Sequence, residues 1–183
     1  MSVTPPNVVE DSERLWAYVV AAVVGLVFAV IIYGSVHWAA QPPSNVETID
    51  ASRLHLAGEF VEGNLGTATQ PDGSVVVRVI AQQYSFVPSC IIVPANTPIV
   101  FRVTSPDVVH GFLIMGTNVN SMVVPGFIAE VRTRFDNAGE HLMPCHEYCS
   151  VGHEGMWAHV KVVDRQEFAT SFGGQPRASC AGQ

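Results

Sequence analysis

The chain has 183 residues, 48% of them hydrophobic, which is enough for one compact domain with its own core plus a short additional element. Its net charge of −7 comes without any basic stretch, so the sequence carries no electrostatic footprint for nucleic-acid binding. Four cysteines are present, and two of them lie close together among histidine, glutamate and methionine. This grouping is more typical of a metal site than of a disulfide framework.

An uncharged segment near the N-terminus decides the expected topology. Residues 15–46 contain no Asp, Glu, Lys or Arg, and the stretch AYVVAAVVGLVFAVIIYGSV has about the 20 apolar residues that a helix needs to cross a bilayer. A cleaved signal peptide normally starts with a basic region, whereas the charged residues before this stretch are Glu10, Asp11 and Glu13 against one Arg14. The sequence therefore predicts an N-terminal tail at 1–14 and one transmembrane helix at 15–40.

Basic residues around the span favour one orientation in the membrane. Arg14 precedes the span, and the next basic residue is Arg53. Because basic residues accumulate on the cytoplasmic side, we expect an integral membrane protein with its N-terminus inside. The remainder of the chain would then lie on the periplasmic or extracellular side.

Short β-type runs follow the span. A polar linker rich in Pro, Ser and Asn is expected at 41–74, and the stretches SVVVRVIAQ, PIVFRVTS, IAEVRTRF and WAHVKVV then read as strands separated by turn residues. Strands without intervening helices predict an all-β domain at 75–164, a Greek-key β-sandwich or barrel. Residues 165–183 are expected to form a C-terminal tail that includes a short helix.

The stretch CHEYCSVGHEGM, from Cys145 to Met156, carries the clearest chemical signal. It places two thiols, an imidazole and a thioether within twelve residues. Soft sulfur ligands with imidazole select copper or zinc, and a weak thioether favours copper. Structural zinc sites usually use closely spaced cysteine pairs and have no use for methionine. We therefore interpret the stretch as a copper-binding loop.

The second cysteine distinguishes this loop from a site for a single copper ion. A mononuclear blue-copper site needs two histidines, one cysteine and an axial methionine. With His110 at the end of an earlier strand, this chain offers that set and one further thiol. Two thiolates can bridge two metals, with nitrogen from His110 and His153, and with Met156 and the Glu147 carbonyl as weak ligands.

These motifs resemble the copper domain of heme-copper oxidase subunit II. The resemblance rests on CHEYCSVGHEGM and TSPDVVHGF, with support from GTNVN, VPGFIAEVRTRF and AQQYSFVPSCIIVPANTPIVF, and it covers about residues 75–163. It implies a cupredoxin-like fold and a dinuclear copper (CuA) centre. The single predicted span is similar to the B-type (ba-type) branch. The ligands implied are His110, Cys145, Glu147 through its carbonyl, Cys149, His153 and Met156.

The resemblance also implies partners and a function. Such a chain is a non-catalytic electron-transfer subunit of cytochrome c oxidase: it takes electrons from a soluble carrier of the cytochrome c type and passes them to heme in subunit I. Tyr84 aligns best with the aromatic residue at which electrons enter, and Phe86 is the next choice, although core packing is the more ordinary role for Phe86. In A-type relatives the carboxylate that matches Glu147 helps to bind magnesium at the boundary with subunit I.

Three questions stay open at this level. Cys90 and Cys180 either form a disulfide or remain two unpaired thiols. A CuA-bearing nitric-oxide reductase would present the same ligands in its electron-entry subunit. A tethered copper-delivery protein is the alternative of another class, but delivery needs exchangeable coordination, whereas this ligand set fills the positions of two coppers.

Overall fold

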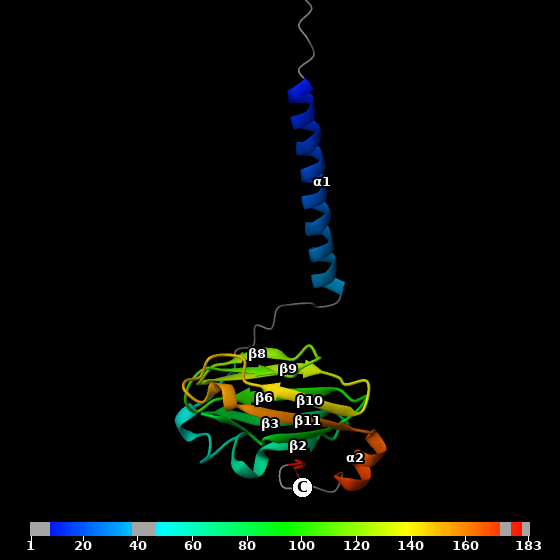
Figure 1. Ribbon diagram of the computed structural model, residues 1–183. Coiled ribbons are helices and arrows are strands. Elements are labelled where there is room, and N and C mark those ends of the chain that lie inside the picture. Colours follow the sequence, from blue (N-terminus) through cyan, green and yellow to red (C-terminus); the bar gives the residue numbers. More distant parts are fainter. Residues whose placement is uncertain (1–7, 38–46, 173–176, 181–183) are drawn as a thin grey trace, which may run out of the picture. The chain divides into compact units, whose positions relative to one another are not determined.

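The computed structural model describes residues 8–37, 47–172 and 177–180, which fall in two compact units, Met1–Asn45 and Val46–Gln183 (Figure 1). In the first unit a single helix, α1 (Val8–His37), is long and apolar enough to cross a membrane over Glu10–Val36. The helix begins seven residues before the expected start at 15, because the acidic residues Glu10 and Asp11 suit the positive end of the helix dipole. The predicted end at 40 lies outside the described residues.

The second unit is built from two facing sheets. The larger sheet has the order β1-β9-β6-β3-β2, with β4 paired to β3 at one end. Its strands are β1 (Glu47–Thr48), β2 (Gly66–Thr69), β3 (Val75–Gln82), β4 (Ser85–Val87), β6 (Ile99–Thr104) and β9 (Phe127–Thr133). The smaller sheet has the order β10-β11-β5, with β5 (Cys90–Pro94), β10 (Gly139–Pro144) and β11 (Trp157–Val163). A separate hairpin joins β7 (His110–Leu113) to β8 (Asn120–Val123).

This topology confirms the predicted cupredoxin-like β-sandwich. Two parallel pairings, β3 with β6 and β5 with β11, are embedded among antiparallel ones, so the chain crosses repeatedly between the sheets. The strands in the described part of the chain do not close into a barrel. Side chains alternate between core and solvent along β11, where Ala158, Val160 and Val162 are buried while Trp157 and His159 are exposed.

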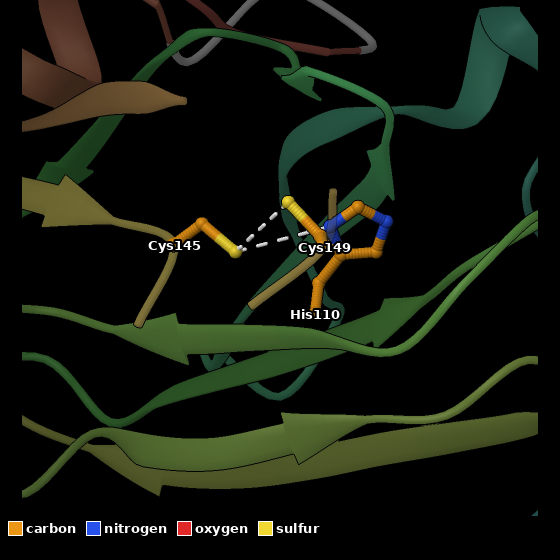
Figure 2. Close-up of side chains that lie close together, drawn as sticks. All are labelled: His110, Cys145 and Cys149. Carbon is orange, nitrogen blue, oxygen red and sulfur yellow. Dashed lines mark hydrogen bonds between the residues drawn. The ribbon is translucent and has the colours of Figure 1, made fainter. Parts of the chain in front are cut away.

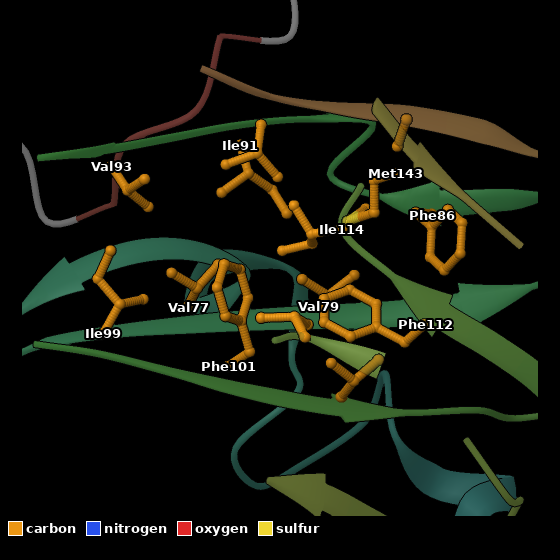
Figure 3. Close-up of a cluster of buried hydrophobic side chains, with 14 of the residues drawn as sticks. Val77, Val79, Phe86, Ile91, Val93, Ile99, Phe101, Phe112, Ile114 and Met143 are labelled. Carbon is orange, nitrogen blue, oxygen red and sulfur yellow. The ribbon is translucent and has the colours of Figure 1, made fainter. Parts of the chain in front are cut away.

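The core lies between the sheets and reaches the loop that carries the candidate metal ligands. Figure 3 shows Val77 and Phe101 of the larger sheet facing Ile91 and Met143 of the smaller one. Phe112 of β7 closes this core, with its ring centroid 5.5 Å from that of Phe101. The same buried cluster contains both free cysteines and Met156, so the stretch with the candidate metal ligands is an extension of the core.

The segment expected to be a linker, at 41–74, requires a correction. Its first residues, 41–46, lie outside the described part of the chain, but from Glu47 onward it forms two strands and two 3₁₀ turns, Ala51–Arg53 and Glu62–Asn64. Leu54 and Phe60 from this stretch are fully buried against Ile80 on the outer face of the larger sheet. The apolar residues of this stretch follow neither a helical nor a strand period, so the sequence does not indicate which of them pack.

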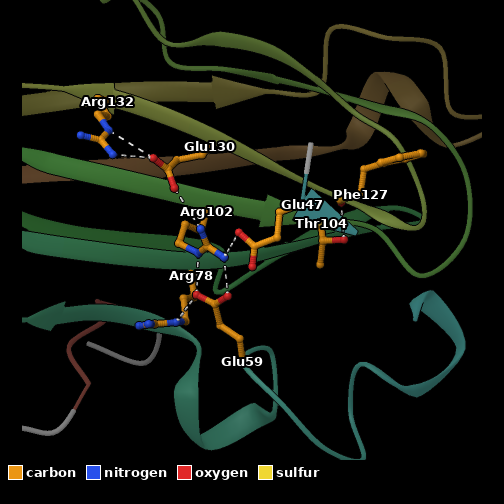
Figure 4. A network of polar contacts seen from close by, with 8 residues as sticks. All are labelled: Glu47, Glu59, Arg78, Arg102, Thr104, Phe127, Glu130 and Arg132. Carbon is orange, nitrogen blue, oxygen red and sulfur yellow. Dashed lines mark hydrogen bonds and ion pairs between the residues drawn. The ribbon is translucent and has the colours of Figure 1, made fainter. Parts of the chain in front are cut away.

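A network of ion pairs connects the segment after the span to the larger sheet (Figure 4). The side chain of Arg102 on β6 is only 14% exposed and contacts Glu59 at 2.6 Å, Glu47 at 2.8 Å and Glu130 at 2.9 Å. Arg78 on β3 contacts the same Glu59 carboxylate at 2.8 Å. Glu59 therefore helps to neutralise two mostly buried arginines: it shares Arg102 with Glu47 and Glu130, and among the described residues it is the acidic partner of Arg78.

We expect Glu59→Gln to lower the free energy of unfolding at pH 7 by about 1–3 kcal/mol. Burial alone would raise the pKa of Glu59, but hydrogen bonds and charge from Arg102, with charge from Arg78, outweigh it and hold the pKa below its usual value. A lowered pKa gives stability that is present at neutral pH and lost as the pH falls through the folded-state pKa. The difference in the free energy of unfolding between Glu59→Gln and wild type should therefore become smaller below about pH 4.

Urea unfolding at both pH values measures this effect. Arg132→Gln is the control, because the Arg132 side chain is 79% exposed in its pair with Glu130. Loss of this exposed pair should lower the free energy of unfolding by no more than about 1 kcal/mol. Equal losses in Glu59→Gln and Arg132→Gln would contradict the role assigned to Glu59.

The described residues after β11, 164–172 and 177–180, are attached to the sandwich. After β11 comes the helix α2 (Arg165–Ser171), and Ala178 then pairs with Thr67 of β2 through two backbone hydrogen bonds of 3.0 and 2.8 Å. Cys180 forms a disulfide with Cys90 at the start of β5, with their Cα atoms 5.0 Å apart. Of the two alternatives for these cysteines, the structure shows the disulfide.

Candidate metal centre

The loop that holds most of the candidate ligands connects β10 to β11. These two strands pair along their whole length, ending with Pro144 opposite Trp157. One further hydrogen bond, from the Cys145 backbone N–H to the Met156 carbonyl (3.0 Å), closes the base of the loop. The pairing of β10 with β11 thus brings Cys145 and Met156, the first and last residues of CHEYCSVGHEGM, side by side. The residues between them form the loop at this end of the two strands.

Inside this loop the sulfur and nitrogen donors converge. The Sγ atoms of Cys145 and Cys149 are 3.8 Å apart, and His110 Nδ1 is 3.9 Å from Cys145 Sγ (Figure 2). On the other side, His153 Nδ1 lies 3.6 Å and Met156 Sδ 3.8 Å from Cys149 Sγ. His110 comes from β7, in a different hairpin. Its ring nitrogen and the sulfur atoms of the two cysteines all lie within 4.8 Å of one another.

These distances fit the bridging of metals by both thiolates. A metal bound about 2.3 Å from each of two sulfurs requires them to lie within about 4.6 Å of one another, and 3.8 Å meets this limit. The Glu147 carbonyl oxygen lies 3.2 Å from Cys145 Sγ, so it faces the same space. The six predicted ligands therefore lie in one group, in which His110 is next to Cys145 and His153 is next to Cys149.

Burial makes this cluster unlike an ordinary pair of thiols. His110 and Met156 are fully buried, and Cys149 is 2% exposed. Burial, together with the neighbouring Cys145 thiol, raises the pKa of Cys149 to about 11. Without metal the thiol keeps its proton at neutral pH, and a bound metal must displace that proton to obtain a thiolate ligand.

Asp107 orients the buried histidine. Its Oδ1 lies 2.9 Å from His110 Nε2, and its carboxylate also accepts backbone N–H bonds from Gln83 and Val108. Burial favours the neutral acid, but the bond from His110 and these backbone bonds outweigh it and hold the pKa of Asp107 below its usual value. An ionised carboxylate can only accept, so His110 carries its proton on Nε2 and presents the Nδ1 lone pair to the cysteine sulfurs.

Gly111, directly after His110, lets the loop close on β7. A Cβ atom built at Gly111 would lie 2.2 Å from His146 Nδ1 and 2.6 Å from the Glu147 backbone nitrogen. No side chain fits between the strand and the loop at this point. His146 itself is exposed, and the sequence offered no signal for this contact because the two segments are distant in the chain.

The two aromatic candidates for electron entry differ in burial. Tyr84, in the β3–β4 turn, is 40% exposed and lies against the metal loop at Gly152. Phe86 is 1% exposed and packs edge-on against Phe112, with centroids 6.1 Å apart. A buried ring cannot contact a docking partner, so Phe86 has the core-packing role that was the alternative to electron entry. Of the two aromatic residues, only Tyr84 remains a candidate for electron entry.

Comparisons with known proteins agree with this description. Residues 77–163 match the family model described as cytochrome c oxidase subunit II, periplasmic domain. A cytochrome c oxidase subunit 2 from one strain of Thermus thermophilus is 32% identical over 154 residues, which cover 83% of this chain and 92% of that protein. Another cytochrome c oxidase subunit 2 from Thermus thermophilus is 34% identical over 123 residues, covering 67% of this chain and 91% of that one.

A solved structure supports the fold. One chain of a heme-copper terminal oxidase dimer superposes with a TM-score of 0.62 at 24% identity, covering 83% of this chain and 99% of that chain. At this identity the superposition supports only the shared fold, whereas the sequence matches support membership of the family.

Proposed function

The chain belongs to the cytochrome c oxidase subunit II family, and from this membership and the geometry of the loop we propose that it is the electron-entry subunit of a heme-copper terminal oxidase. In this role it takes electrons from a soluble carrier of the cytochrome c type and passes them to heme in subunit I. The observation that carries the proposal is the pair of buried thiols 3.8 Å apart, flanked by two imidazoles and a thioether. No oxygen chemistry is assigned to this chain.

The proposed cofactor is a dinuclear copper (CuA) centre. The residues that would hold it are His110, Cys145, Cys149, His153 and Met156, with the Glu147 backbone carbonyl. Cys145 and Cys149 would supply thiolate sulfur to both coppers, and the bound centre would accept and release one electron at a time. The protein supplies a dry, rigid set of ligands: core residues exclude water, and Asp107 fixes the His110 ring.

The two histidines are suited to different tasks. His110 is fully buried and its outer nitrogen is held by Asp107, so it cannot meet another subunit. His153 is only half-buried, and its ring packs edge-on against the exposed Tyr148 with centroids 5.9 Å apart. The proposed electron exit to subunit I therefore runs through His153. Magnesium binding at the subunit I boundary through the Glu147 carboxylate is part of the same proposal.

Electron entry is assigned to the exposed face around Tyr84. Trp157, which follows the ligand Met156, is 49% exposed and adds a second aromatic ring to the surface near the loop. We expect Tyr84→Leu to slow reduction by the native carrier about tenfold, the effect of losing one aromatic hot spot. Leucine keeps an apolar side chain over the loop while removing the ring. Stopped-flow reduction of the copper-loaded chain measures the rate, and an unchanged rate with an intact copper spectrum would remove Tyr84 from the entry route.

Membrane topology completes the proposal. Helix α1 would be the single anchor, with the N-terminus in the cytoplasm and the copper domain on the periplasmic or extracellular side. The family description as a periplasmic domain and Arg14 before the span support this orientation. Protease added to intact spheroplasts should cleave the copper domain, and protection of that domain would reverse the assignment.

Copper content and electron paramagnetic resonance test the function. The full chain in detergent, loaded with copper, should hold two coppers and show one unpaired electron shared over two copper nuclei. The relatives named as oxidase subunits favour this role over a nitric-oxide reductase, and the enclosed ligand set speaks against copper delivery. A spectrum of one isolated copper, or preferential retention of zinc, would overturn the dinuclear assignment.

A further inference from the structure

The turn between β3 and β4 contacts the metal loop at two points, Cys149 and Gly152, although it contributes no ligand. Gln83 donates from its side-chain amide to the Cys149 carbonyl at 2.8 Å, in a partly buried bond. Its backbone N–H donates to Asp107 Oδ2 at 2.7 Å, and the other oxygen of Asp107 is bonded to His110. One residue is thus linked to the backbone of a cysteine ligand and to the carboxylate that orients a histidine ligand.

The next residue of the turn presses on the loop from the same side. A Cβ atom built at Gly152 would lie 2.7 Å from two ring carbons of Tyr84, closer than real Cβ contacts. The ring therefore rests directly on the Gly152 backbone, one residue before His153. Any side chain at position 152 would have to displace either the ring or the segment that carries His153.

Between these two contacts the backbone is strained. Ser150 has φ +100°, a region that residues with a side chain rarely adopt. Such conformations are unfavourable and persist only where the surroundings enforce them. The Gln83 bond holds the chain at Cys149, directly before Ser150, and Tyr84 holds it at Gly152, two residues after it.

We propose that Gln83 and Tyr84 form a positioning clamp that fixes the geometry of the copper loop. The clamp keeps Cys149 and His153 in place against His110 by enforcing the strained turn at Ser150 and by bracing Asp107. This inference rests on the proposed function, because its purpose is to hold a ligand set ready for metal. It adds that the precision of the centre depends on a turn distant in sequence, 66 residues from Cys149.

Two variants of the full chain in detergent separate the contacts of the clamp. Gln83→Leu removes the amide at similar size, and Gly152→Ala forces the Tyr84 ring and the loop apart. Gly155→Ala is the matched control, since Gly155 lies in the same loop and a Cβ atom added there would have nothing within 4 Å. Hydrogen exchange of the metal-free chain and copper release to a chelator are measured for each.

Amides of residues 145–156 should exchange about five- to tenfold faster in Gln83→Leu and in Gly152→Ala, as expected for the loss of one hydrogen bond or tight contact. Copper should be lost to the chelator about tenfold faster or more. Gly155→Ala should match wild type in both measurements, and amides of β3 and β6 should stay protected in all variants, showing that the fold is intact.

Exchange of the loop at the wild-type rate in both variants would overturn the clamp. Equal acceleration in Gly155→Ala would also overturn it, because the loop would then respond to any added methyl group. If wild type takes up no copper, the proposed function fails, and the exchange rates of the metal-free chain still decide whether the clamp exists.

Discussion

Cys149→Ser should abolish the shared two-copper signal completely and leave at most one copper per chain. Serine has nearly the same shape as cysteine, but its hydroxyl is a poor ligand for a soft metal and cannot bridge two coppers. The remaining sulfur, Cys145 Sγ, would still have His110 Nδ1 at 3.9 Å, so one metal could stay on that side. His153 and Met156 would lose the sulfur that lies between them.

Copper analysis and electron paramagnetic resonance of the purified full chain measure this loss. The metal-free variant should unfold at nearly the wild-type urea concentration, because a thiol and a hydroxyl of similar volume occupy the same place. Retention of two coppers with a shared electron in Cys149→Ser would contradict the bridging role and with it the dinuclear assignment.

The proposed ligand set could be predicted from the sequence because most of it is contiguous. Five of the six predicted ligands fall between Cys145 and Met156, so a hairpin loop of any shape brings them close. His110 lies outside that stretch and was identified by its own motif. The strands were predicted for a similar reason, since alternation along β11 is a local property of the chain.

Contacts between segments that are distant in the chain could not be predicted from the sequence. Gln83 lies 66 residues from the carbonyl that it holds, and a lone glutamine in a turn carries no signal of that bond. Gly111 and Gly152 read as ordinary loop or strand glycines until the segments above them are placed. Arg102 looks like an outward residue of an alternating strand, yet it is nearly buried, because the segment after the span brings Glu47 and Glu59 over it.

The second large effect concerns the disulfide between Cys90 and Cys180. The double variant Cys90→Ser/Cys180→Ser should lower the free energy of unfolding by about 2–5 kcal/mol. The bond spans 90 residues of sequence, so it removes much of the freedom of the unfolded chain. It also ties the C-terminal segment to β5, beside the backbone bonds between Ala178 and Thr67 of β2.

Urea unfolding of the metal-free full chain, followed by the β-sheet signal, gives the change in free energy. Copper loading of the same variant is the second measurement. The disulfide partners belong to neither the metal loop nor the clamp, so the shared two-copper signal should persist under conditions where the variant is folded. The two predictions thus serve as controls for one another: Cys149→Ser loses copper and keeps stability, whereas the disulfide variant loses stability and keeps copper. A disulfide variant that unfolds at the wild-type urea concentration would show that the backbone pairing of Ala178 alone secures the C-terminus.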